Sequence, residues 1–193
     1  DTLSAVYLSA LKDRIYCNAV DDRTRRRAQT VLFDIADALT RIVSPILVHT
    51  SDEAWLALHG GSEADSVHLR ELPTFEAADR DGRWPAVMEL RGEILRCLEE
   101  SKATLGFKNP LDAGVRARVP AEQFAEVEPF AGEFADLTGV SRFELNEGET
   151  LDIQIDDLRE EPKCERSWKR DGTVRERSDG GMLTDRDAAV LGI

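Results

Sequence analysis

Residues 31–45 read VLFDIADALTRIVSP, and this stretch predicts a long helix. Its apolar residues recur with the 3.6-residue period of an amphipathic helix; they are Val31, Leu32, Ile35, Leu39, Ile42 and Val43. Pro45 cannot continue a helix, so we expect the helix to end just before it. Asp21 and Asp22 place negative charge at its start, where the helix dipole favours an anion.

Two further helices are predicted beside it. Residues 2–17 carry an apolar stripe at helical spacing, made of Leu3, Tyr7, Leu8, Leu11 and Ile15. Residues 50–53 read TSDE, which fits a capping box with Thr50 as the N-cap and Glu53 at the third helical position. The helix that follows should stop at Gly60. Three helices joined by short turns predict part of an antiparallel bundle over residues 1–60.

The sequence changes character after residue 60. Residues 61–83 are rich in Gly, Ser, Asp and Glu and predict a connector, of which residues 66–69 are expected to pack back on the bundle. Beyond it we expect helices over residues 84–105 and 122–137 and strands over residues 113–119, 140–145 and 151–155. Residues 84–158 therefore predict a small domain of helices packed on a short sheet. The fold class is α+β.

Composition excludes several classes of protein. The net charge of -13 argues against a free-standing nucleic-acid binder, but the positive charge gathers in residues 23–27 and 163–177, which confines any RNA contact to those zones. No apolar run is long enough to span a bilayer and no signal sequence opens the chain, so we expect no membrane partner and a cytoplasmic location. The three cysteines do not suggest disulfides; Cys17 and Cys97 are expected to be plain buried thiols.

Catalytic motifs are not evident in this sequence. It has no Gly-rich phosphate loop and no G-x-S-x-G, and its three histidines do not share one helical face at the H-E-x-x-H spacing. We assign structural or solvent-exposed roles to His49, His59 and His68. The Asp-Asp and Glu-Glu pairs of this acidic chain are interpreted as parts of solvent-exposed faces rather than as catalytic carboxylates. No catalytic residue is predicted.

Residues 159–193 form a polar tail with the spacing of a zinc knuckle. Its four ligand positions are separated by 3, 17 and 3 residues and hold Cys164, Ser167, Thr184 and Asp187. A structural zinc ion needs two chelating turns rich in Cys or His, and here only Cys164 offers a thiolate. We therefore expect a degenerate, zinc-free knuckle. Without metal the tail must be held by packing of apolar side chains, for which Trp168, Val174, Met182, Leu183 and Val190 are candidates, or remain mobile.

Several ordered stretches resemble one family. They are LSAVYL (3–8), KDRIY (12–16), RRAQTVL (26–32), SPIL (44–47), TSDEAW (50–55), SVHL (66–69), LR (90–91) with LEE (98–100), VS (140–141) and the knuckle beginning KCERSW (163–168). Together they resemble the C-terminal region of bacterial-type isoleucyl-tRNA synthetases, which are class I aminoacyl-tRNA synthetases. The resemblance covers essentially the whole chain in order. The family has four cysteines where this chain has its knuckle positions, which is the main departure.

The resemblance implies a function and partners. The family joins isoleucine to its tRNA with ATP and magnesium and carries a separate editing domain; its two active-site signatures are not found here, so this chain alone should be inactive and should bind neither cofactor. Residues 1–60 should be the later part of the family's anticodon-binding helical bundle. The expected partners are isoleucine tRNA and the catalytic and editing domains of the parent chain, and no DNA.

The resemblance and the basic zones together suggest RNA-contacting residues. Arginine and lysine pair with phosphates, and an exposed aromatic ring can stack on an unpaired base. The candidates are Lys12, Arg25, Arg26, Lys163, Arg166, Trp168 and Lys169. A solvated helix start with salt bridges along the helix remains an alternative for Lys12, Arg25 and Arg26. A hydrophobic plug of the tail remains an alternative for Trp168. Two other functions stay open: the equivalent region of a leucyl- or valyl-type synthetase, and an acidic protein-interaction module that ignores RNA.

Overall fold

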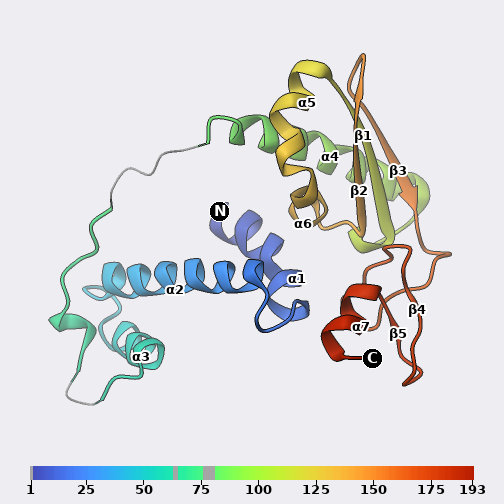
Figure 1. Ribbon diagram of the computed structural model, residues 1–193. Helices are drawn as coiled ribbons and strands as arrows, with labels where there is room; N and C mark the ends of the chain where they lie inside the picture. Colours follow the sequence, from blue (N-terminus) through green and yellow to red (C-terminus); the bar gives the residue numbers. More distant parts are fainter. Residues whose placement is uncertain (1, 63–64, 76–80) are drawn as a thin grey trace. The chain divides into compact units, whose positions relative to one another are not determined.

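The computed structural model describes residues 2–62, 65–75 and 81–193. The chain forms two compact units, one of residues 1–19 with 80–193 and one of residues 20–79. These divisions differ from the segment ends expected at residues 60, 83 and 158. Helices combined with small sheets confirm the α+β class (Figure 1).

A three-stranded mixed sheet forms the centre of the first unit. Its strands are β1 (Ala113–Pro120), β2 (Arg142–Gly148) and β3 (Asp152–Asp157), in the order β2-β1-β3. The central strand β1 runs parallel to β2 and antiparallel to β3. Along β1, Val115, Ala117 and Val119 are buried while Arg116 and Arg118 are exposed. One face of the sheet therefore faces the core and the other is polar.

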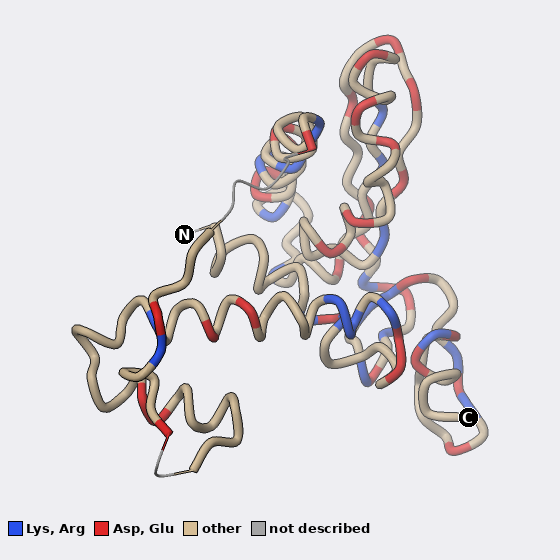
Figure 2. The backbone as a smooth tube through the Cα atoms, turned by 60° about the vertical axis from the view of Figure 1, so that its left-hand side comes forward, with Lys and Arg blue, Asp and Glu red and all other residues tan. Residues whose placement is uncertain are grey.

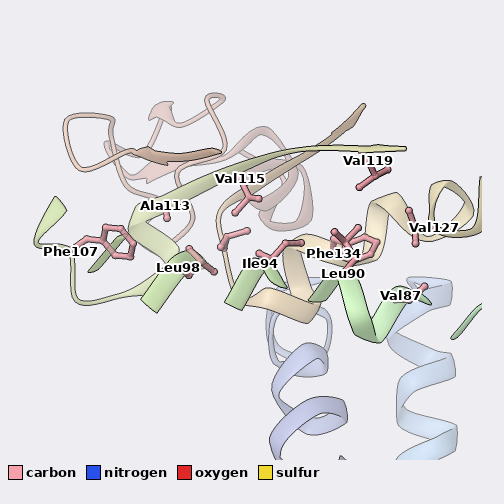
Figure 3. Close-up of a cluster of buried hydrophobic side chains, with 11 residues drawn as sticks. Val87, Leu90, Ile94, Leu98, Phe107, Ala113, Val115, Val119, Val127 and Phe134 are labelled. Carbon is pink, nitrogen blue, oxygen red and sulfur yellow. The ribbon is translucent and has the colours of Figure 1, made fainter. Parts of the chain in front are cut away.

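Helix α4 (Trp84–Leu105) supplies the other half of this core. Its buried residues Val87, Leu90, Ile94 and Leu98 recur at intervals of three and four, so they form one stripe along the helix. This stripe packs against the buried face of the sheet, together with Phe134 (Figure 3). Each such fully buried side chain contributes about 1.5–3 kcal/mol. The helix predicted over residues 84–105 is confirmed.

The crossover between β1 and β2 differs from the single helix predicted over residues 122–137. It consists of α5 (Ala121–Val127), a 3-10 helix (Glu128–Glu133) and α6 (Phe134–Thr138). Pro129 causes the break, because it lacks an N–H and its ring clashes with the carbonyl group four residues earlier. The prediction of one continuous helix was wrong at this point.

The N-terminal helix belongs to the first unit. Residues Thr2–Leu8 form π-helical turns that continue into α1 (Ser9–Cys17), so the predicted helix over residues 2–17 is present. Helix α1 packs against α6. Arg14 on α1 forms ion pairs with Glu133 and with Asp136, the latter at 2.9 Å. Of the expected buried thiols, Cys17 is buried and Cys97 is half-buried.

The second unit is a helix pair. Helix α2 (Arg23–Val43) packs against α3 (Val48–His59), and its end before Pro45 is confirmed. Asp22 is its N-cap and accepts a hydrogen bond from the backbone N–H of Arg25 at 2.9 Å. Arginine residues gather in the first turns of α2, whereas acidic residues are frequent in strands β2 and β3 of the first unit (Figure 2).

The capping box predicted at residues 50–53 was wrong. Helix α3 begins at Val48, and its N-cap Leu47 makes no side-chain cap hydrogen bond. The turn after α2 explains this start: Leu47 N–H bonds to the Val43 carbonyl, and the Leu47 carbonyl accepts from Ser51 N–H. Thr50 is therefore already inside the helix. The predicted stop is confirmed, because Gly60 adopts the left-handed conformation that ends α3.

The expected packing of residues 66–69 on the helix pair is confirmed. Val67 is fully buried, and the Asp52 carboxylate on α3 accepts hydrogen bonds from Ser66 Oγ at 2.7 Å and Val67 N–H at 2.9 Å. The centroid of the Trp55 ring lies 4.5 Å from that of the His59 ring and 4.7 Å from the Arg70 guanidinium. His59 also binds Asp37 at 2.8 Å. These contacts give His59 a structural role.

The tail folds as a hairpin followed by a short helix. Strands β4 (Arg175–Glu176) and β5 (Met182–Leu183) pair antiparallel, and α7 (Asp185–Leu191) follows them. Its small core contains Cys164, Val174, Leu183 and Ala188, with Met182 packed against it. Trp168 is not part of this core, since 55% of it is exposed. The alternative of Trp168 as a hydrophobic plug is therefore not supported.

Candidate nucleic-acid interface

The four knuckle positions meet in the folded tail. The Cys164 thiol and the Ser167 hydroxyl both donate hydrogen bonds to Asp187 Oδ2, at 3.0 and 2.6 Å. The Thr184 hydroxyl accepts from the Asp187 backbone N–H at 3.0 Å and caps α7. Asp187 and Cys164 are completely buried, and Thr184 is 1% exposed. The spacing therefore does bring its four residues to one point.

This group of side chains does not fit a structural zinc ion. Its donor atoms are one thiol, two neutral hydroxyls and one carboxylate, and the thiol and the Ser167 hydroxyl already bind the carboxylate as hydrogen donors. A tetrahedral zinc site requires deprotonated thiolates or imidazoles instead. In the part of the chain that the structure describes, no three His, Cys, Asp or Glu side chains are grouped so that they could hold a metal ion.

Two arginines surround the Asp187 carboxylate. Arg186 donates to Asp187 Oδ1 at 3.1 Å, and the Arg166 Nε atom lies 3.8 Å from the same oxygen. Burial alone would raise the pKa of Asp187, but the hydrogen bonds from Ser167 and Cys164 and the charge of Arg186 lower it below its ordinary value. The buried carboxyl group is therefore ionised.

Trp168 protrudes from the first knuckle turn. Its backbone N–H bonds to the Cys164 carbonyl at 3.0 Å, and its φ of 63° lies in the left-handed region that non-glycine residues rarely adopt. The Lys163 ammonium lies 4.7 Å from the centroid of the Trp168 ring, a cation–π distance. The turn therefore presents an aromatic ring at the surface with a cation on one face.

A cavity of about 450 Å³ opens beside this ring. It is lined from α1 by Lys12 and Tyr16, from the tail by Arg166, Trp168 and Lys169, and from the loop before β1 by Leu111 among others. Tyr16 is 73% exposed, and its ring is a second aromatic surface that the sequence analysis did not propose as a site residue. Four of the seven candidate residues thus line one cavity.

Arg166 and Lys169 also bind protein groups at this place. Arg166 donates to the Tyr16 carbonyl oxygen at 3.1 Å. The Lys169 ammonium lies 3.1 Å from Asp13 on α1 and 3.0 Å from Asp136 on α6. The same Asp13 pairs with Arg186, whose Nη2 is 3.0 Å from it. Ion pairs therefore join the tail to two helices of the first unit, an arrangement that no local sequence signal indicated.

Arg25 and Arg26 lie in the second unit. Both are in the first turns of α2, where Arg26 is exposed and Arg25 is half-buried. The helix start is also where Asp22 caps the backbone. A solvated helix start and a phosphate contact are both compatible with this placement. No helix among residues 2–62, 65–75 and 81–193 is long and apolar enough to cross a membrane.

Comparison with known proteins agrees with the family resemblance found in the sequence. A family model described as the anticodon-binding domain of tRNA ligase matches residues 1–117. The match covers more than half of the chain, so the chain belongs to the family of tRNA-ligase anticodon-binding domains.

The individual relatives are isoleucine–tRNA ligases. The enzyme of Syntrophotalea carbinolica is 33% identical over 98% of this chain and 22% of its own length. The enzyme of Bacillus mycoides is 32% identical over the same shares, and that of Brevibacillus brevis is 36% identical over 76% of this chain and 16% of its own length. The chain thus spans about a fifth of the length of these relatives. The resemblance to isoleucyl-tRNA synthetases stated from the sequence is confirmed, and its zinc-knuckle part stays a prediction.

Proposed function

We propose that this chain binds the anticodon stem and loop of isoleucine tRNA, as part of an isoleucine–tRNA ligase in the cytoplasm. The rest of such a ligase would supply the ATP- and magnesium-dependent joining of isoleucine to tRNA and its editing. The bound anticodon would then orient the distant acceptor end. The similarity to isoleucine–tRNA ligases favours this amino acid over leucine or valine.

The exposed Trp168 ring beside the cavity is the observation that carries the proposal. One of its faces carries Lys163, and the ring, Lys12 and Tyr16 line the same cavity. Stacking of an unpaired base on an aromatic side chain is worth about 1–3 kcal/mol, and the neighbouring ammonium groups would attract the phosphates that flank such a base. The cavity has the residue types that a single-stranded loop needs.

The remaining candidates contribute positive charge. Arg25 and Arg26 would contact phosphates from the second unit, in the most basic stretch of the chain. Arg166 and Lys169 would act from the cavity wall while keeping their bonds to Tyr16, Asp13 and Asp136. The acidic strands β2 and β3 of the first unit would point their charge away from the RNA.

Fluorescence anisotropy with two tRNA transcripts tests the proposal. One transcript is isoleucine tRNA and the other is the same tRNA with a replaced anticodon. The chain should prefer the first, and Trp168→Ala should remove most of that preference. Phe75→Ala, which removes another exposed aromatic ring, is the matched control and should keep it. Equal affinity for both transcripts would contradict anticodon recognition, and no binding at low salt would favour the acidic interaction module.

A further inference from the structure

The Asp187 carboxylate is the meeting point of the two tail turns. The first turn reaches it through Cys164 and Ser167, which both donate to Oδ2. The second turn contains Asp187 itself, and Arg186 donates to the other oxygen, Oδ1, at 3.1 Å. Both oxygens are therefore occupied, as a carboxylate with no exposed surface requires.

A metal ion at the same place would use the opposite arrangement of charge. Zinc is a central cation that binds anionic ligands from two turns. In this chain a central anion binds hydrogen donors from the same two turns, and Arg186 and Arg166 supply the balancing positive charge. A zinc ion would have to remove the proton from Cys164 and displace Ser167 from the carboxylate. The residues at the four positions therefore disagree with the metal that the family resemblance implies.

The carboxylate also reaches beyond the tail. Arg186 binds Asp187 and, through both of its terminal nitrogens, the Asp13 carboxylate on α1. Asp187 is in this way linked to the helix against which the tail lies. A buried ion pair that loses one partner leaves an uncompensated charge. The contacts among Asp187, Arg186 and Asp13 therefore depend on all three side chains.

We propose that the Asp187 carboxylate takes the place of a metal ion at the centre of this tail, which folds and docks on α1 without zinc. The proposal does not depend on RNA binding. It assigns Asp187 a positioning role: the side chain holds the turn of residues 164–168 against α7, and through Arg186 it holds the tail against Asp13.

Metal analysis of the purified, untagged chain is the first test. The chain should contain far less than one zinc per molecule after folding in the presence of zinc. Its thermal unfolding should be the same with and without a chelator. Stoichiometric zinc, or a midpoint that falls when a chelator is added, would overturn the proposal.

A matched pair of carboxyl-to-amide variants is the second test. Asp187→Asn should loosen the tail, so that trypsin cleaves after Lys169 and Arg186 about tenfold faster than in the wild type. Glu176→Gln makes the same chemical change at an exposed position of β4 and should leave the cleavage rate unchanged. Equal protection of Asp187→Asn and the wild type would show that the carboxylate is not the centre of the tail.

Restoring a metal site is the third test. The triple variant Ser167→Cys, Thr184→Cys, Asp187→Cys places four cysteines at the converging positions and should bind one cobalt(II) ion with the visible absorption of a tetrahedral thiolate site. Its resistance to trypsin should then require metal, unlike that of the wild type. Tetrahedral cobalt absorption in the wild type, or none in the triple variant, would contradict the proposed geometry.

Discussion

The Lys169 ammonium lies 3.0 Å from the Asp136 carboxylate, a contact that joins the tail to α6 across 33 residues of chain. Asp13 binds the same ammonium from α1 at 3.1 Å. Burial would lower the pKa of Lys169, but the charges of Asp136 and Asp13 raise it above its ordinary value, so the group stays protonated. The residue next to Trp168 is therefore held by ion pairs to two helices.

Replacement of Lys169 should destabilise the first unit. In Lys169→Met, Asp13 and Asp136 lose their shared cation, and we expect the free energy of unfolding to fall by about 2 kcal/mol. Urea denaturation followed by circular dichroism measures this. Lys163→Met removes an exposed lysine of the same tail and should change the free energy by less than about 0.5 kcal/mol. An equal effect of both variants would show that the ion pairs add no stability.

Two variants of Trp168, whose backbone is left-handed, should distinguish the residue's effect on stability from its effect on RNA binding. Trp168→Gly and Trp168→Ala lose the same ring, but only glycine adopts a positive φ without strain. We expect the glycine variant to be more stable than the alanine variant by about 1 kcal/mol, measured by thermal or urea unfolding. Both should bind isoleucine tRNA equally weakly in the anisotropy assay. A more stable alanine variant would mean that the turn relaxes without the indole.

Acid should weaken the contact between the tail and α1. Burial would raise the pKa of Asp13, but the hydrogen bonds and charges of Arg186 and Lys169 lower it below its ordinary value. The stability from this carboxylate is complete above about pH 4 and is lost as the pH falls through the lowered pKa. Urea midpoints of the wild type should therefore fall more steeply below about pH 4 than those of Asp13→Asn. If the urea midpoints of the two proteins fell in parallel with pH, the Asp13 carboxylate would not be the source of the acid sensitivity.

The salt dependence of binding should report on Lys12. If its ammonium contacts one phosphate, Lys12→Ala should reduce the slope of log affinity against log salt concentration by about one. Lys102→Ala is the control, because Lys102 pairs with Glu99 on α4. Anisotropy titrations of isoleucine tRNA at several salt concentrations measure both slopes. An unchanged slope for Lys12→Ala would remove this residue from the interface.

Local sequence signals predicted most helices and strands correctly. The periodicity of α2 and α4 and the stops at Pro45 and Gly60 were sufficient, because each depends on neighbours along the chain. The two errors had a different source. The helix over residues 122–137 is broken by Pro129, a signal that was present in the sequence. The start of α3 depends on the backbone hydrogen bonds of the preceding turn.

The candidate site was predicted in part. The knuckle spacing correctly grouped Cys164 with Asp187, and the basic zone of the tail correctly contained the exposed Trp168. Tyr16 was not proposed, because nothing local shows which aromatic residues face a cavity. The contacts of Lys169 could not be predicted either, since Asp13 and Asp136 come from distant parts of the chain.

The sequence by itself determined the family, the α+β class and the poor set of metal donors at the four knuckle positions. These depend on residue identity and order, which are visible without a fold. Only the tertiary structure decided what occupies the centre of the tail and what holds it. A buried carboxylate needs hydrogen-bond donors from several segments at once. Only the folded chain brings Cys164 to Asp187, and brings Asp13 to the Arg186 side chain that also binds Asp187.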